Sequence, residues 1–285
     1  MNIAVIGATG LIGKPVTQQL IKAGFTVTIL ARHPEQIGTL FPSARVIEAD
    51  LQKPDTILAG LQNQQMLYLN LSVRQNEKIT DFHTETDGMK TILAAAKEAG
   101  IQRIGYLSSL VMRYQNMDGF HWWVFDIKEE AVRLLKASGI SVSIFYPSTF
   151  MESFLMQIQG PLLALGGSSS IKLWFIAGQD YGQQVVRDFR LPGNESRDYV
   201  IQGPEAHTYD EAAHLFIKNY TKKKLYTLKA PVGILQFLGR FNRKMNYGGH
   251  ILEAMNNYPE RFEAERTWTV LGKPTTTLSE FARQQ

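Results

Sequence analysis

Short apolar runs alternate with longer amphipathic segments through the first half of the chain. The runs are rich in β-branched residues and lie at 2–7, 26–31, 44–49, 65–71, 103–109 and 142–147. Such runs are typical of strands buried on both faces. Between them, apolar residues recur every three or four positions, which predicts helices over 11–23, 54–62, 75–99 and 122–138. Strands joined by helical crossovers run parallel, so the pattern predicts an α/β fold with an open, doubly wound parallel sheet.

The pattern becomes less regular after Pro147. It predicts a helix near Phe154, a loop of glycine and serine, a strand over 171–176, and helices over 208–220, 232–244 and 250–258. We therefore expect two parts. Residues 1–150 would form the sheet domain, and residues 151–285 would form a smaller C-terminal lid packed on it.

Three glycines follow the first predicted strand directly. Gly7, Gly10 and Gly13 lie in the run GATGLIG, where the first helix is expected to begin. Glycine allows a tight turn, lets the backbone approach a pyrophosphate, and permits close packing of helix on strand. The free N–H groups at the helix N-terminus would meet the anion. A plain strand-to-helix turn is the alternative, but the alternating strand and helix pattern favours dinucleotide binding.

The end of the second strand distinguishes the two nicotinamide dinucleotides, because the adenosine ribose lies there. An acidic side chain accepts from a free 2′-hydroxyl, whereas a basic one pairs with a 2′-phosphate. Here Arg32 ends the strand, His33 follows it, and the next carboxylate is Glu35. A planar guanidinium suits phosphate, so we expect NADP(H) to be favoured over NAD(H). In the alternative, Arg32 is simply solvated at the end of the strand.

Asp50 ends the third predicted strand and is followed by Leu51. The carboxylate is placed to accept from the adenine amino group, and Leu51 is placed to pack on the ring. The alternative for Asp50 is an N-cap for the next helix, and both roles can hold at once.

Several motifs together resemble the atypical short-chain dehydrogenase/reductases. They are GATGLIG, Arg32, Asp50, YLSS at 106–109, the helix of Lys128, LLKASGISVSIFYPSTFMESF at 134–154 and LGKPTTTLSEFA at 271–282. More narrowly, the chain is similar to the NmrA-like group of NAD(P)-binding proteins, which includes quinone oxidoreductases, isoflavone-reductase-like enzymes and redox-sensing regulators. The resemblance implies a Rossmann fold whose cofactor contacts come from Gly7, Thr9, Gly10, Leu11, Ile12, Gly13, Arg32, Asp50, Leu51, Asn70, Leu71, Lys128, Tyr146, Pro147, Ser148 and Phe150.

The resemblance also exposes a departure at the reaction centre. In the larger superfamily, a Tyr four residues before a Lys supplies the proton during hydride transfer. Lys128 is present and is expected to hold the nicotinamide ribose, but the position four residues before it is Val124. The alternative is that Lys128 is a solvated charge beside Glu129 and Glu130. The possible substitutes for the phenol are Ser109, Tyr114 and His121. A quinone can also take its proton from water.

Aromatic residues crowd the start of the Lys128 helix, where Trp122 and Trp123 are adjacent. Two adjacent indoles on a helix cannot both face one core, so we expect at least one to border the cleft or an interface. A flat apolar substrate would suit such a wall.

Composition narrows the class of protein further. The 285 residues carry a net charge of +4, and 218–244 holds eight of the 30 basic residues and no acidic one. This basic segment favours a solvated rim over an anionic partner, and no DNA-reading motif accompanies it, so nucleic acid is not expected. The absence of cysteine excludes disulfides, a thiolate nucleophile and Cys-ligated zinc. No metal site is predicted.

The expected function is an NADP(H)-binding oxidoreductase that passes hydride to a small, aromatic or quinoid acceptor. The main alternative is a catalytically silent NADP(H) redox sensor that acts through a protein partner. A sugar-nucleotide epimerase or dehydratase shares the fold but normally needs the missing Tyr. The N-terminus has no secretory pattern, and the longest uncharged stretch, 153–171, is interrupted by polar residues. We therefore expect a cytoplasmic protein without a membrane partner.

Overall fold

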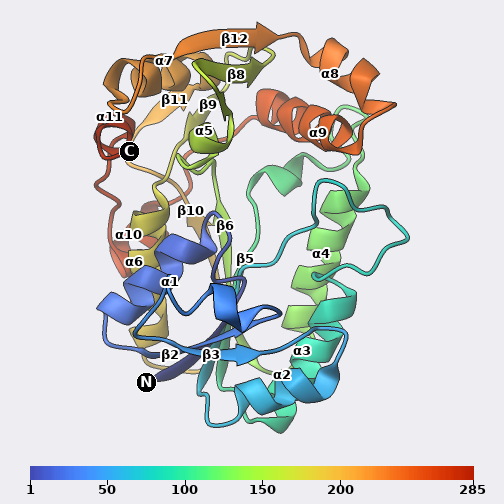
Figure 1. The fold of residues 1–285 in the computed structure, drawn as a ribbon, viewed down its shortest axis with the longest axis vertical. Helices are drawn as coiled ribbons and strands as arrows, with labels where there is room; N and C mark the ends of the chain where they lie inside the picture. Colours follow the sequence, from blue (N-terminus) through green and yellow to red (C-terminus); the bar gives the residue numbers. More distant parts are fainter.

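A seven-stranded parallel sheet forms the centre of the molecule (Figure 1). The computed structural model describes residues 1–285, apart from the side chains of residues 234–236. Across the sheet the strands are β10 (Arg197–Ile201), β6 (Ser141–Pro147), β5 (Arg103–Leu107), β4 (Met66–Leu69), β1 (Asn2–Ile6), β2 (Thr26–Ala31) and β3 (Arg45–Glu48). Each adjacent pair is parallel. This order confirms the predicted doubly wound α/β fold.

Helices cover both faces of this sheet (Figure 1). On one side lie α1 (Gly13–Lys22) and α6 (Gly178–Arg190), and on the other lie α2 (Pro54–Leu61), α3 (Asp87–Glu98) and α4 (Trp123–Lys136). Successive strand residues point to opposite faces. In β1, Ile3 and Val5 pack toward α1 and α6, while Ala4 and Ile6 pack toward α2 and α3. All four are buried, which explains why the strands are apolar without interruption.

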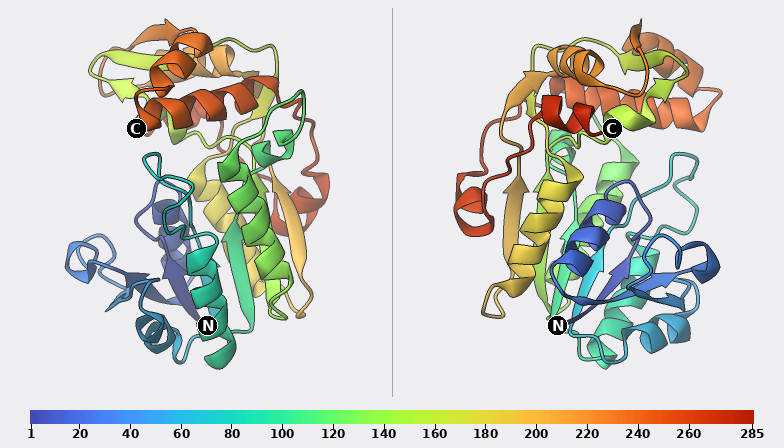
Figure 2. Two further views of the ribbon diagram at one scale, coloured as in Figure 1. Left: turned by 90° about the vertical axis from the view of Figure 1, so that its right-hand side faces the viewer. Right: turned by 60° about the vertical axis from the view of Figure 1, so that its left-hand side comes forward.

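Most of the second half of the chain stands over the carboxyl ends of the strands, as both views in Figure 2 show. Its helices are α5 (Ser153–Met156), α7 (Tyr209–Asn219), α8 (Val232–Gly239), α9 (Arg243–Asn257) and α11 (Leu278–Arg283). Its strands are β7 (Ile158–Gln159), β8 (Leu162–Gly166), β9 (Lys172–Trp174), β11 (Ala206–Thr208) and β12 (Tyr226–Ala230). Their apolar side chains form a separate core, which includes Phe154, Phe175 and Phe216. The rest of the described chain includes α10 (Glu265–Leu271) and two short 3-10 turns, η1 (Pro34–Gln36) and η2 (Val111–Tyr114).

The chain returns to the sheet after residue 150. Strand β10 pairs with β6, and α6 packs on the sheet through Tyr181, Val185 and Phe189. A domain boundary at residue 150 therefore separates β10 and α6 in sequence from the sheet to which they belong. The sequence pattern does not predict β10, because its five residues include exposed Asp198 and lack a continuous apolar run.

Three predicted helices are wrong in extent. The helix expected over 75–99 is α3 alone, and the residues before it form a loop. Asp81 and Asp87 accept from the backbone N–H groups of Lys78 and His83, bonds that compete with helical ones. The helix expected over 232–244 is α8, which ends at Gly239. The helix expected over 250–258 is α9, which begins seven residues earlier, at Arg243. The Asn242 side chain caps α9 by accepting from Lys244 and Met245.

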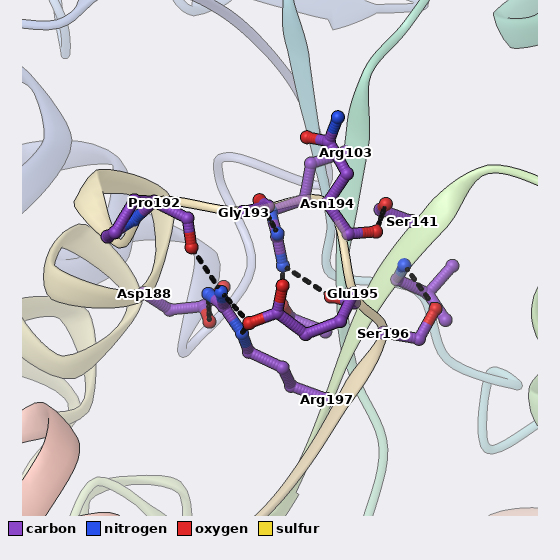
Figure 3. A network of polar contacts seen from close by, with 11 residues as sticks. Arg103, Ser141, Asp188, Pro192, Gly193, Asn194, Glu195, Ser196 and Arg197 are labelled. Carbon is purple, nitrogen blue, oxygen red and sulfur yellow. Dashed lines mark hydrogen bonds and ion pairs between the residues drawn. The ribbon is translucent and has the colours of Figure 1, made fainter.

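A buried arginine network holds the loop between α6 and β10 against the amino end of the sheet (Figure 3). Arg103, on β5, donates to Ser143 Oγ at 3.1 Å, to the carbonyl of Glu195 at 3.3 Å and to that of Gly193 at 2.7 Å. Arg103 is 4% exposed. Nearby, Arg197 Nη1 lies 3.5 Å from Asp188 Oδ1, which is fully buried on α6. The network therefore ties β10 to the sheet.

We expect Arg103→Ala to lower the free energy of unfolding by about 2 to 3 kcal/mol, because one buried and two partly buried acceptors lose a charged donor. Arg45→Ala is the matched control, since Arg45 is an exposed strand residue. Urea denaturation of both variants measures the difference. Equal losses in the two variants would contradict the role assigned to this network.

Candidate functional site

A cavity of about 470 Å³ lies at the carboxyl edge of the sheet. It is placed where the strand order reverses, between β1 and β4, which is the usual ligand position in doubly wound sheets. Several residues expected to contact a cofactor line it: Gly7, Thr9, Arg32, Asp50, Leu51, Asn70 and Leu71. The fold thus brings together residues from the ends of four strands.

The glycine turn at the mouth of α1 is fixed by backbone contacts. Gly7 has φ +87°, and a Cβ there would lie 2.1 Å from the Asn70 carbonyl oxygen. A Cβ on Gly13 would lie 1.9 Å from the carbonyl oxygen of Gly7. At Gly10 the nearest atom would be Asn70 Nδ2, a side-chain atom, at 3.0 Å. The first and third glycines are therefore required by the fold itself.

Asn70 holds this turn in place. Its Nδ2 donates to the Gly7 carbonyl at 3.3 Å, and its backbone N–H donates to the Ile6 carbonyl at 3.0 Å. No described side chain caps the N-terminus of α1, and its first turn has no acidic residue. The positive end of the helix dipole is therefore free to meet an anion.

Arg32 lies at the end of β2 on the wall of the cavity. Its side chain is exposed and makes no hydrogen bond or ion pair within the described part of the chain. Asp50 uses Oδ1 to accept from the Gln52 N–H at 3.0 Å. The N-cap of α2 is Lys53, so the alternative role of Asp50 as that N-cap is wrong.

The loop after β4 contributes cavity residues that the sequence analysis missed. Ser72, Arg74, Phe82 and Thr84 line the cavity beside the expected residues. They lie in or next to the segment that was predicted as helix. The aspartates and threonines of 80–87 are turn and capping residues, and they could have indicated the loop.

Lys128 lies on α4 and is paired to a buried acid. Its Nζ donates to Glu85 Oε1 at 2.8 Å, and the side chains of Lys128 and Glu85 are 14% and 0% exposed. Tyr106 OH donates to the same oxygen at 2.5 Å. Burial, reinforced by the Glu85 charge, raises the pKa of Tyr106 well above its usual range. Lys128 is therefore not the solvated charge considered as the alternative.

Val124 faces the protein interior. It is 2% exposed and packs in an apolar cluster with Tyr114, Phe120 and Trp122. Tyr114 donates to Asp118 Oδ2 at 3.4 Å, and burial raises its pKa.

The other candidate donors have surroundings of their own. His121 is exposed and lies 3.1 Å from Asp126. Ser109 is half-buried at the end of β5. In the described part of the chain, Ser109, Tyr114 and His121 form no hydrogen bond or ion pair with Lys128, so their catalytic roles stay predictions.

The two adjacent indoles have different ring neighbours. Trp122 is buried and stacks on His250 at 5.5 Å, whereas half-buried Trp123 lies 5.3 Å from the ring of His83. Both line a smaller cavity of about 190 Å³ together with Tyr247. The aromatic run therefore forms part of a wall between α4 and α9.

The expected cofactor residues at the end of β6 and just after it do not line the main cavity. Tyr146 lines a different cavity of about 420 Å³, with Arg113 5.9 Å from its ring. Ser148 Oγ donates to Glu260 Oε2 at 2.9 Å, and Phe150 packs on Tyr181. The remaining expected residues are placed as follows: Leu11 is exposed beside the turn, while Ile12 and Pro147 are buried.

Glu152 follows β6 and reaches the start of α6. Its Oε1 accepts from the Gly178 N–H at 2.8 Å, and Oε2 has no hydrogen-bond partner among the described residues. A Cβ on Gly178 would touch both Glu152 and Pro15, so this carboxyl lies against the first turn of α1. Burial raises its pKa to about 7.

Residues 1–282 match the NmrA-like family. The chain belongs to this family. The match confirms the family resemblance of the sequence motifs over nearly the whole chain. No described helix is long and apolar enough to cross a membrane.

Relatives of this NmrA-like protein have diverse names. Photosystem II assembly factor Ycf39 of Synechocystis sp. is 22% identical, over 85% of this chain and 74% of its own. A (4-alkanoyl-5-oxo-2,5-dihydrofuran-3-yl)methyl phosphate reductase of Streptomyces griseus is 28% identical, over 73% of this chain and 70% of its own.

Solved structures share the fold over the whole chain. The NADPH-dependent quinone oxidoreductase QOR2 of Escherichia coli, complexed with NADPH, is 22% identical with a TM-score of 0.75, covering 99% of both chains. The triphenylmethane reductase of Citrobacter sp., complexed with NADP(H), is 16% identical with a TM-score of 0.77, covering 100% of this chain and 99% of its own. At these identities the likeness shows the fold alone.

We expect the stability of this NmrA-like protein to fall as pH rises through the pKa of Glu152. The folded pKa of about 7 lies above the ordinary value of 4.5, so the folded state holds a proton that the unfolded state releases. This contribution is complete below pH 4.5 and is lost as pH rises to about 7. Glu152→Gln should flatten the dependence and melt at a higher temperature than wild type at pH 8.

Melting temperatures between pH 5 and pH 8 measure this effect. Glu48→Gln is the control, since Glu48 is exposed on β3. An unchanged pH profile for Glu152→Gln would rule out a protonated Glu152 in the fold.

Proposed function

We propose that the protein is an NADP(H)-dependent oxidoreductase that passes hydride to a small aromatic or quinoid acceptor. One observation carries the proposal: the cavity at the β1 and β4 switch point combines the glycine turn at an uncapped helix with an unpaired arginine. This combination matches the pyrophosphate and 2′-phosphate of NADP(H).

The residues present fit the cofactor. The turn from Gly7 to Gly13 would hold the pyrophosphate, and Arg32 would pair with the 2′-phosphate. Asp50 has its second carboxylate oxygen left to accept from the adenine amino group, because only Oδ1 is used by the local turn. Arg74, on the same wall, adds a second guanidinium that is 58% exposed.

The similar proteins support a reductase. QOR2 and triphenylmethane reductase are named as reductases and are complexed with NADPH or NADP(H). The Streptomyces relative is also named a reductase. Quinones are flat conjugated molecules, and the aromatic wall of Trp122 and Trp123 suits acceptors of that shape.

The proposed chemistry needs little from the protein beyond positioning. Bound NADPH would supply a hydride from its nicotinamide ring. A quinone reduced in this way would gain its proton from water. Lys128 would hold the nicotinamide ribose and so help to orient the cofactor. A buried Val124 in place of a phenol is compatible with this acceptor, because no dedicated acid is required.

A redox sensor remains the second candidate. Photosystem II assembly factors are among the relatives, and an assembly factor acts on other proteins. The absent phenol at position 124 also suits a protein without turnover. A sugar-nucleotide epimerase has less support, since that reading requires the phenol.

We expect Arg32→Ala to weaken NADPH binding by roughly ten- to a hundredfold and to leave NADH binding nearly unchanged. A charge-assisted hydrogen bond contributes about 1.5 to 3 kcal/mol, and only NADPH carries the 2′-phosphate. Isothermal titration with both cofactors measures the change, with Arg45→Ala as the control. Equal losses for the two cofactors would remove the phosphate role.

We expect Lys128→Ala to lower kcat/KM for quinones by a larger factor than it weakens NADPH binding. Such a difference means that transition-state stabilisation is lost beyond uniform binding. Steady-state oxidation of NADPH with a quinone panel provides the rates. If wild type binds NADPH but oxidises it with no quinone, aldehyde or enone, the sensor function replaces the oxidoreductase function.

A further inference from the structure

Glu85 is a buried carboxylate in which one oxygen accepts two hydrogen bonds and the other accepts none from the described residues. Lys128 Nζ and Tyr106 OH both donate to Oε1, at 2.8 Å and 2.5 Å. Oε2 has no hydrogen-bond partner among the described residues, although Glu85 is 0% exposed. A buried charged oxygen without a donor is costly, and protein folds rarely leave one unmatched. The arrangement therefore points to a donor supplied by a ligand.

The position of Glu85 connects it to the cofactor cavity. Thr84, the preceding residue, lines that cavity, and its hydroxyl donates to the Ser72 carbonyl on the same wall. Glu85 precedes α3, while Lys128 lies on α4 and Tyr106 on β5. The pair thus sits between the sheet and two helices, next to a residue that lines the cavity.

Groups from the covering part of the molecule face the same place. Burial, together with the charges of Glu85 and Glu77, raises the pKa of Tyr247 on α9 to about 12. Glu77 is itself paired with His83, at 3.0 Å, and with Arg74, at 2.9 Å. Glu77 is therefore matched within the protein, whereas Glu85 keeps an unmatched oxygen.

The chemistry of the pair defines what it would bind. Lys128 uses one ammonium proton on Glu85 and has others left, and its side chain is still 14% exposed. An acceptor and a donor side by side complement two neighbouring hydroxyl groups. NADP(H) carries such a pair on the ribose attached to nicotinamide, whereas its other ribose carries the 2′-phosphate.

We propose that Glu85 Oε2 accepts a hydrogen bond from one hydroxyl of the nicotinamide ribose, while Lys128 donates to the other. The inference rests on the proposed NADP(H) function and adds Glu85 as a cofactor-binding residue. Tyr106 is a positioning residue, because it touches only Oε1 and fixes the carboxylate plane. With both protein donors on Oε1, Oε2 is the oxygen left to accept from the ligand.

Two fragments of NADP(H) separate the ribose contact from the rest of the cofactor. The fragment 2′-phospho-ADP-ribose contains the ribose that carries nicotinamide in NADP(H). The fragment 2′,5′-ADP lacks this ribose. In Glu85→Gln, the amide oxygen stays with Lys128 and Tyr106, so the NH₂ group takes the place of Oε2, where it cannot accept. We expect roughly ten- to a hundredfold weaker binding of 2′-phospho-ADP-ribose and binding of 2′,5′-ADP within about twofold of wild type.

Titration calorimetry on the full chain measures both fragments. Glu129→Gln, a carboxyl beside Lys128 on α4, is the matched control and should change neither affinity. Glu85→Asp keeps the charge and withdraws the carboxylate by one methylene, so it should show the same selectivity if Glu85→Gln does not fold. Tyr106→Phe should give a smaller loss, also confined to the fragment with the ribose.

The outcomes distinguish this inference from the proposed function. Equal weakening of both fragments, or no change in either, would overturn the role of Glu85 and leave the cofactor assignment intact. Failure of wild type to bind 2′,5′-ADP or NADPH would overturn the proposed function, and this inference with it.

Discussion

The structure depends on one close backbone contact, where Gly7, Gly13 and Asn70 meet between β1, α1 and β4. No side chain fits there, since Cβ atoms on the two glycines would lie about 2 Å from carbonyl oxygens. This contact sets where α1 begins and aims its uncapped N-terminus at the cavity. It also fixes the distance between the first and fourth strands at the switch point. The anion site and the sheet geometry therefore have a common origin.

The loop after β4 turns this scaffold into a site with two ends. Its side chain to backbone hydrogen bonds keep it out of helical conformation. As a result, Thr84 faces the cavity and Glu85 is buried beside Lys128. A helix through the same residues would have displaced this pair. The irregular loop after β4 thus places Glu85 in the proposed ribose site.

The charges around Lys128 differ from those of the Tyr and Lys pair in the larger superfamily. The ammonium is balanced by Glu85, and the place of the phenol belongs to an apolar cluster. Lys128 is therefore oriented for binding more than for lowering the pKa of a neighbour. That property fits an acceptor that draws its proton from water. It also fits a sensor, which needs occupancy and no turnover.

The sequence by itself determined the alternating strands and helices, the glycine turn, the position of Arg32 and the family. These features come from short-range patterns, in which periodicity and glycine placement act within a few residues. Only the tertiary structure decided that β10 and α6 complete the sheet, and that Tyr146 at the end of β6 does not line the main cavity. It also decided that Glu85 pairs with Lys128, 43 residues away along the chain. No local pattern encodes such a pair, because burial and charge matching arise only when distant elements pack together.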